Sequence, residues 1–123
     1  MSAVLDFIVP PLGLAPNTRF RLDAIEGADG LFALRALDDD ALRLYAVDPQ
    51  TVVAGYAPTL TDENVDALGL TEADDALLLV VASHTADGVH VNLLAPIVAH
   101  RDTGAAAQVI LEGQDYPLRA PLG

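Results

Sequence analysis

The chain has 123 residues and a hydrophobic fraction of 52%, which suits one folded domain over residues 1–123 and excludes a disordered chain. It contains no cysteine, so disulfides, thiolate catalysis and cysteine-based metal sites are excluded. The formal charge is −12, and all six basic residues are arginines. We expect no direct nucleic-acid binding and no membrane binding, because this charge repels phosphates and anionic lipids. It favours a basic protein partner, although solubility or adaptation to high salt would also explain it.

No apolar run reaches the roughly 20 residues that a membrane-spanning helix needs. The longest run, Ala76–Ala82, has the length of a strand. The N-terminus has no basic stretch ahead of an apolar core, so we expect no signal peptide and a cytoplasmic location.

The first half of the chain predicts three short strands, Thr18–Ile25, Leu31–Leu37 and Leu42–Val47. The first alternates apolar and polar side chains, as a half-buried strand does. Turns are expected at Gly27–Gly30 and Asp38–Asp40, so the strands should form antiparallel hairpins. Asp48-Pro49 should end the third strand, because proline cannot continue the hydrogen-bond ladder.

One short helix is predicted after Thr61. The threonine can accept a hydrogen bond from free amides at the helix start, and Asp62 and Glu63 suit the positive end of the helix dipole. Gly69 is typical of the left-handed residue that follows a helix. The helix therefore has about two turns, too few to be stable alone.

The second half predicts further strands at Ala76–His84, Val89–Leu94, Ile97–His100 and Ala107–Leu111. The first of these is apolar without alternation, which indicates burial on both faces. Asp87-Gly88 predicts a tight hairpin turn. Roughly eight short strands and one helix define an all-β, mainly antiparallel domain, either a small barrel or a sandwich.

Residues that could carry catalysis are sparse. Ser83 precedes His84 on one predicted strand, where neighbouring side chains point to opposite faces and cannot pair as nucleophile and base. The sequence has no nucleophile elbow, phosphate-binding glycine loop or calcium-loop pattern. The 18 acidic residues leave a catalytic carboxylate pair open, but no spacing singles one out. We therefore expect a protein that is not an enzyme and needs no cofactor.

Two histidines flank the predicted Asp87-Gly88 turn. With a two-residue turn, Thr85 opposes His90, and His84 and His90 face opposite ways. With a three-residue turn the histidines would oppose each other and a two-histidine zinc arrangement would become available. No third ligand accompanies them, so we predict no metal site.

Three motifs follow one another in the C-terminal part: Val91–Val98 (VNLLAPIV), Gln108–Leu111 (QVIL) and Tyr116–Arg119 (YPLR). Others precede them in order: Leu12-Gly13-Leu14, Leu37-Asp38-Asp39, Val47-Asp48-Pro49, Tyr56 with Pro58 and Leu60, and the helix end Leu68-Gly69-Leu70. This ordered set resembles the FliW family of flagellar assembly factors. The chain departs from the family pattern at Gln50–Gly55 and at Ala99-His100.

The resemblance implies a small antiparallel β-barrel-like domain that is a monomer when free and switches between partners. FliW proteins bind flagellin in the cytoplasm. When flagellin is exported, they bind the RNA-binding repressor CsrA and allosterically relieve its repression of flagellin synthesis. The residues expected at the partner surface are Asp48, Pro49, Tyr56, Glu63, Asp66, Asn92, Pro96, Ile97, Gln108 and Tyr116.

Several of these residues also have structural explanations. Pro96 can mark a bulge or an edge, Asn92 can satisfy backbone groups in a turn, and Ile97 suits a core position. For Gln108 and for Tyr116, a hydrogen-bonded structural role and contact with a partner are equally expected. Two other functions stay open: a ligand-binding or enzymatic barrel, and an acidic mimic of nucleic acid, although the acids cluster at turns and on the helix.

Overall fold

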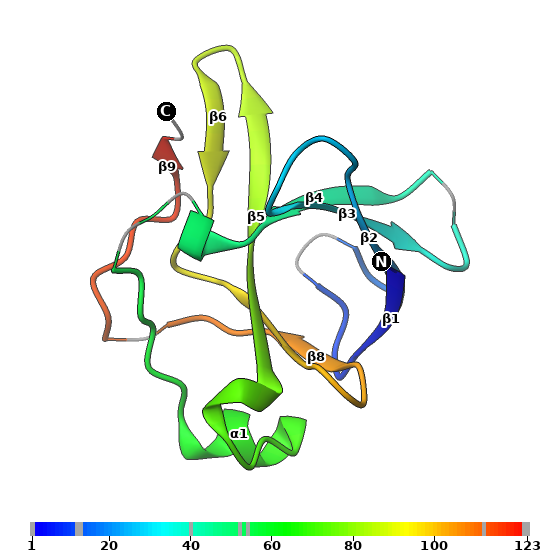
Figure 1. The fold of residues 1–123 in the computed structure, drawn as a ribbon, viewed down its shortest axis with the longest axis vertical. Coiled ribbons are helices and arrows are strands. Elements are labelled where there is room, and N and C mark those ends of the chain that lie inside the picture. Colours follow the sequence, from blue (N-terminus) through cyan, green and yellow to red (C-terminus); the bar gives the residue numbers. More distant parts are fainter. Residues whose placement is uncertain are drawn as a thin grey trace.

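The computed structural model describes residues 2–11, 14–39, 41–51, 53, 55–111 and 113–121 (Figure 1). The strands are β1 (Ser2–Phe7), β2 (Arg19–Ala24), β3 (Leu31–Ala36), β4 (Arg43–Val47), β5 (Ala76–Thr85), β6 (Gly88–Val91), β7 (Ile97–His100), β8 (Ala105–Gln108) and β9 (Ala120–Pro121). The helices are α1 (Asp62–Leu68) and the short 3₁₀ turns η1 (Pro49–Thr51) and η2 (Ala73–Asp75). Leu12 and Gly13 of the expected Leu-Gly turn, and Asp40, lie outside the described residues.

Seven strands close into a barrel in the order β4-β3-β2-β1-β8-β7-β5, because β5 also pairs with β4. The remaining strands β6 and β9 extend the sheet outward from β5. All pairings are antiparallel except the one between β1 and β8. Closure satisfies the strand edges that an open sheet would leave unpaired. The predicted all-β, mainly antiparallel barrel-like fold with one short helix is confirmed, and the sandwich alternative is wrong.

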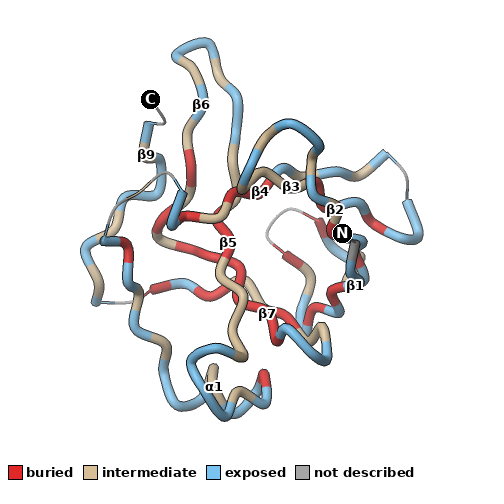
Figure 2. Tube along the Cα trace, in the orientation of Figure 1, coloured by how far each residue is buried: buried red, intermediate tan, exposed pale blue. Residues whose placement is uncertain are grey.

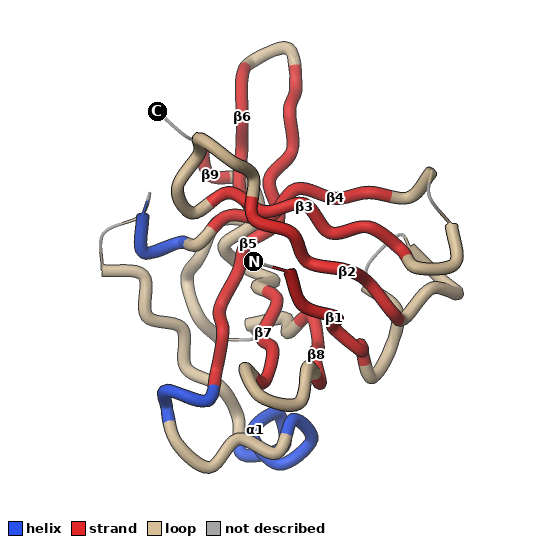
Figure 3. The backbone as a smooth tube through the Cα atoms, turned by 45° about the vertical axis from the view of Figure 1, so that its right-hand side comes forward, coloured by secondary structure: helices blue, strands red, loops and turns tan. Residues whose placement is uncertain are grey.

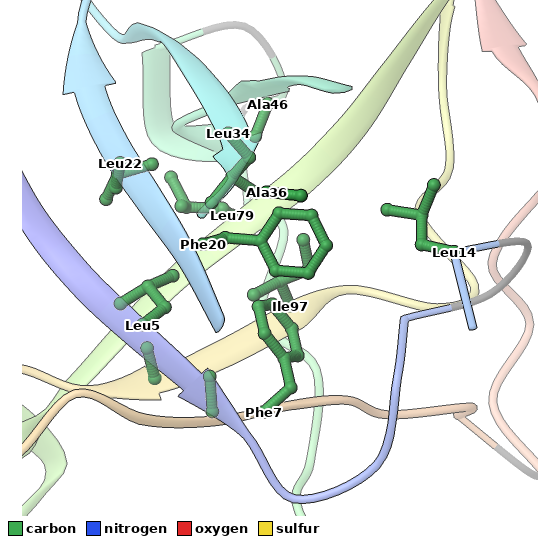
Figure 4. Close-up of a cluster of buried hydrophobic side chains, with 12 residues drawn as sticks. Leu5, Phe7, Leu14, Phe20, Leu22, Leu34, Ala36, Ala46, Leu79 and Ile97 are labelled. Carbon is green, nitrogen blue, oxygen red and sulfur yellow. The ribbon is translucent and has the colours of Figure 1, made fainter. Parts of the chain in front are cut away.

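Apolar side chains from all seven strands of the barrel fill its interior (Figure 4). Phe7 and Phe20 meet edge to face, with ring centroids 5.6 Å apart and planes at 80°. Phe20, Leu79 and Ile97 are fully shielded from solvent. Burying a side chain of this size stabilises the fold by about 1.5–3 kcal/mol, so this cluster accounts for much of the stability of the barrel.

A second layer of apolar side chains covers part of the outer barrel surface. Val80 packs outside with Tyr56 and Leu93, while its neighbour Leu79 points inside. A third cluster joins Leu68 of α1 to Val98 on β7. Figure 2 shows the buried segments gathered where β5 and β7 cross the middle of the molecule. The predicted two-sided burial is therefore confirmed for the apolar run Leu77–Val81, whereas Ser83 and His84 at the end of the predicted strand are exposed.

The predicted helix signals are also confirmed. The side-chain oxygen of Thr61 accepts a hydrogen bond from the amide of Asn64 at 3.2 Å. Gly69 follows α1 with φ of 68°, a left-handed conformation that glycine adopts without strain, and its amide bonds back to Asp66.

Several predicted strand boundaries are wrong for local reasons. The predicted Val89–Leu94 strand ends at Val91, because the side chain of Asn92 captures the amides of Leu94 and Ala95 at 3.1 and 3.0 Å. The strand predicted at Ala107–Leu111 lies instead at Ala105–Gln108. The amide of Val109 still donates to the Pro96 carbonyl, but proline has no amide hydrogen to return the bond, so the regular ladder stops there. Strands β1 and β9 have no counterpart among the predictions.

The β5–β6 hairpin turns one residue earlier than expected. Thr85 pairs with Gly88, so His90 opposes Ser83 and not Thr85, and that part of the prediction is wrong. The turn still has two residues. His84 pairs with Val89, and the two histidines therefore lie on opposite faces, as predicted for a two-residue turn.

Gly104 offers a test of barrel closure. A Cβ at this position would overlap the carbonyl oxygen of Val4 on β1, and φ there is +81°. Gly27 has a similar φ of +83° but open space around it, which makes it a matched control. We expect Gly27→Ala to lower the free energy of unfolding by about 1 kcal/mol and Gly104→Ala by about 2 kcal/mol more. Urea unfolding measures both, and equal losses would contradict the close approach of β1 to the β7–β8 turn.

Candidate partner-binding surface

Half of the residues expected at the partner surface lie where three loops meet beside the barrel. Tyr56 is only 3% exposed, and its hydroxyl donates to the carbonyl of Leu93 at 2.5 Å. Its ring packs edge to face against Tyr116, with centroids 4.8 Å apart. The amide of Leu93 in turn donates to the carbonyl of Pro117 at 3.1 Å. These contacts tie the loop before α1 to the loop after β6 and to the C-terminal segment.

Gln108 and Pro96 lie next to this junction, whereas Ile97 belongs to the barrel interior. The side-chain amide of Gln108 donates to the carbonyl of Ala95 at 3.1 Å, next to the Asn92 turn. Pro96 precedes β7 and is fully buried, and Ile97 lies inside the barrel. The side chains of this group hold loops and core, and their contact with a partner stays a prediction.

Asp48 and Pro49 make the turn that leaves β4. The amide of Asp48 donates to the carbonyl of Gly30 at 2.7 Å, and its carboxylate accepts from the amide of Gln50 at 3.0 Å. Pro49 is fully buried. The Asp-Pro motif therefore ends a strand, as predicted, and its role in partner binding is untested.

Glu63 and Asp66 differ from the other expected residues, because both lie exposed on α1. Further exposed acids follow along the same part of the chain, namely Asp62, Glu72 and Asp74. Glu72 and Asp74 lie on the segment that leads from α1 into β5, so the acids gather at one end of the barrel, below β5 in Figure 1. A basic surface would be attracted here at short range.

An apolar groove of about 400 Å³ lies at the same end of the barrel; Glu72 is part of its lining, and α1, which carries Glu63 and Asp66, contributes Val65 to its wall. It is lined by Pro58, Leu60, Val65, Leu70, Thr71, Glu72, Ala73, Ala76, Leu78 and Val98. Sequence reasoning missed it, because the groove depends on how the stretch from Pro58 to Leu78 folds back on itself and against Val98 of β7. An apolar hollow with a charged rim can take an apolar side chain of a partner while the rim selects for positive charge.

Asp75 braces the segment beside the groove. Its carboxylate accepts hydrogen bonds from the amide and hydroxyl of Thr71 at 3.0 and 2.8 Å and from the amide of Glu72 at 3.0 Å. The bonds from Thr71, followed by that from Glu72, lower the pKa of this carboxyl group. Arg101 ties the same turn to the β7–β8 connection, donating to the carbonyl of Asp74 at 3.0 Å.

Asp75, His100 and Asp102 form the one cluster of metal-ligand types among the described residues, with ligand atoms within 4.8 Å of one another. Hydrogen bonds already occupy part of it, since His100 Nδ1 accepts from the Asp102 amide at 3.0 Å. Together with the bonds to Asp75, this explains the cluster as a braced turn. Sequence reasoning considered only groups that are close in the chain as metal ligands, namely His84 with His90 and the acids Asp38–Asp40, and therefore missed it.

The fold and this surface define a class of protein: a small closed β-barrel that presents an acid-rimmed apolar groove suited to binding other proteins. In the described part of the chain, no helix is long and apolar enough to cross a membrane. A sequence model of the FliW protein family matches residues 1–122, and the chain therefore belongs to the FliW family.

Named relatives agree with this assignment. The flagellar assembly factor FliW of Thermotoga neapolitana is 34% identical over 89 residues, which cover 70% of this chain and 60% of the relative. That of Ruminiclostridium cellulolyticum is 28% identical over 119 residues, covering 94% and 80%. A crystal structure of the flagellar assembly factor FliW superimposes with a TM-score of 0.88 over 96% of this chain and 84% of that chain, at 24% identity, which supports the fold.

Replacing Tyr56 tests the loop junction. Tyr56→Phe keeps the ring against Tyr116 but leaves the Leu93 carbonyl without its donor, so we expect a loss of about 2 kcal/mol in the free energy of unfolding. Tyr45, which is 40% exposed, is the matched control, and Tyr45→Phe should change stability by less than about 0.5 kcal/mol. Similar small changes in both variants would contradict a structural role for the Tyr56 hydroxyl.

The same residue predicts a weakness at alkaline pH. Burial, with a smaller contribution from Tyr116, raises the pKa of Tyr56 to about 12. The unfolded phenol loses its proton near pH 10, so the stability from neutral Tyr56 is complete below that pH and is lost as pH rises towards 12. The expected slope is about 1.4 kcal/mol per pH unit. Denaturant titrations at several pH values measure it, and a slope that is the same in Tyr56→Phe would refute its origin in this residue.

Proposed function

We propose that this chain is a cytoplasmic flagellar assembly factor that acts by binding other proteins and not by catalysis. In this proposal it binds flagellin and, when flagellin has been exported, binds CsrA and allosterically relieves the repression of flagellin synthesis. The match of the FliW family to residues 1–122 is the observation that carries the proposal. The names of the relatives, all flagellar assembly factors, support its general part.

The acid-rimmed groove is the contact surface that we assign to CsrA. A protein that binds RNA must present basic residues to the phosphates. Glu63, Asp66 and Glu72 would attract such a surface, and the apolar floor, which includes Leu60 and Val65, would bury an apolar side chain of the partner. The attraction raises the association rate more than the final affinity. Because this chain carries a charge of −12, its complex with CsrA would also repel RNA.

The barrel interior bears on the alternative of a small-ligand barrel. Side chains such as Phe7, Leu34 and Leu79 fill the space that a ligand would need. Barrels of about eight strands have little room to spare once side chains occupy the centre. The packed interior thus favours a surface that binds macromolecules.

Calorimetry with purified flagellin and purified CsrA from the same organism tests the proposal directly. Each should bind the full chain separately, and excess flagellin should lower the fraction of the chain that CsrA captures. Failure to bind either protein would overturn the proposed function and leave the barrel fold untouched.

Charge variants test the assignment of the groove. The double substitution Glu63→Gln with Asp66→Asn should lower the rate of association with CsrA about threefold to tenfold at low salt and flatten its dependence on salt. The control, Asp29→Asn with Asp87→Asn, removes the same charge from exposed turns elsewhere and should have a much smaller effect. Stopped-flow measurements at several salt concentrations compare them. An equal effect of both pairs would assign the attraction to net charge and not to this surface.

A further inference from the structure

Three arginines lie side by side across β2, β3 and β4. The strand register pairs Arg21 with Arg35, and Arg35 with Arg43. All three are exposed, while Phe20 and Leu34, which alternate with them, point into the barrel. The arginine row therefore runs across the outer surface of three neighbouring strands, at right angles to the strand direction.

This arrangement should make the sheet less stable. Like charges directly opposite each other on neighbouring strands destabilise a sheet. The chain has only six basic residues against 18 acidic ones, yet half of the basic residues fall in this row.

The partners of the arginines leave the centre of the row open. Arg21 pairs with Asp23 at 2.9 Å, and Arg43 lies over the ring of Tyr45 at 5.1 Å from its centroid. Arg35 is different, because its neighbour two positions back is Ala33, and the described residues give it neither a hydrogen bond nor an ion pair. The guanidinium at the centre of the row is thus available to a ligand.

A surface hollow of about 460 Å³ lies beside the row, lined by Arg21, Arg35, Ala36 and Leu37. Leu37, which is 42% exposed, lines this hollow. At the two ends of the row, Val4 (44% exposed) pairs with Arg21, and the ring of Tyr45 (40% exposed) lies under Arg43. In Figure 3, β2, β3 and β4 lie side by side in the upper part of the molecule, whereas α1 lies at the bottom. The arginine row is therefore a surface separate from the acid-rimmed groove.

We propose that the arginine row binds the carboxylates of an acidic helix on a protein partner. This inference does not rest on the proposed function. The planar guanidinium matches a carboxylate with two parallel hydrogen bonds, and the apolar border matches side chains that a helix carries between its acids. Asp23, which pairs with Arg21, and Asp6, which lies opposite Arg19 on the neighbouring strand, restrict the row to a short run of charges, which disfavours a long phosphate polymer.

Spacing favours a helix over an extended segment. Neighbouring strands lie about 4.8 Å apart, so the three arginines span about 9.6 Å. Acids at positions i, i+3 and i+7 of a helix span about 10.5 Å, at a rise of about 1.5 Å per residue. Acids at i, i+2 and i+4 of an extended strand span about 13 Å, which overshoots the row.

The test uses the full ¹⁵N-labelled chain and a soluble alanine-based helical peptide with glutamates at i, i+3 and i+7. NMR titration should shift amides of β2, β3 and β4, and the same peptide with glutamines should not. Arg35→Gln should weaken peptide binding about tenfold, whereas Arg119→Gln, which removes one exposed charge elsewhere, should change it less than about twofold.

Stability and competing ligands complete the test. If the row is kept for binding, Arg35→Gln should leave the thermal midpoint equal or higher, since it relieves repulsion; a lower midpoint would assign the row to folding and overturn the proposal. Tripolyphosphate that binds these amides more tightly than the glutamate peptide would also overturn it, as would binding of the glutamine peptide. Self-association that Arg35→Gln abolishes would assign the row to a second copy of this chain instead.

Discussion

The pairing of β5 with β4 is the constraint on which the rest of the structure depends. Strand β5 has ten residues, longer than any other strand, and its first half pairs with β7. At Val80–Ala82 it turns to β4 and closes the barrel, and beyond that it continues outward as one arm of the β5–β6 hairpin. One strand therefore shapes the barrel, supports the outer clusters and provides part of the groove floor. Its run of apolar residues is what two-sided burial demands.

The junction around Tyr56 explains why a family motif need not mark a binding surface. Asn92, Pro96 and Tyr116 stand out in the sequence, and each of them fixes a loop or fills the space between loops. Such residues are constrained by backbone groups that must find partners once buried. Surfaces that meet another protein need only shape and charge, which many sequences can supply. In the proposed function, the exposed acids of α1 would come under this second kind of constraint.

Features that depend on neighbours along the chain could be predicted from the sequence. Thr61 and Gly69 bound α1 through contacts a few residues away, and Asp48-Pro49 ends β4. Features that need distant partners escaped it. Strand β1 pairs with β2 and with β8, which lies about a hundred residues further on, and Ala105–Gln108 has too many alanines to signal a strand. The groove and the arginine row follow from topology and register, so neither could be predicted from local patterns.

The parallel pairing of β1 with β8 carries a consequence for the order of folding. Asp6 and Phe7 pair with Ala105 and Ala106. The second edge of β1 therefore stays unpaired until about a hundred further residues have been synthesised. During synthesis, the β1–β4 meander can pair within itself but keeps two free edges until β5 and β8 have been made. Free edges invite pairing with other chains. Closure is thus a late event, because it depends on contacts between residues far apart in the sequence. A chain whose synthesis stops before Gln108 would expose unpaired strand edges and would be prone to aggregate.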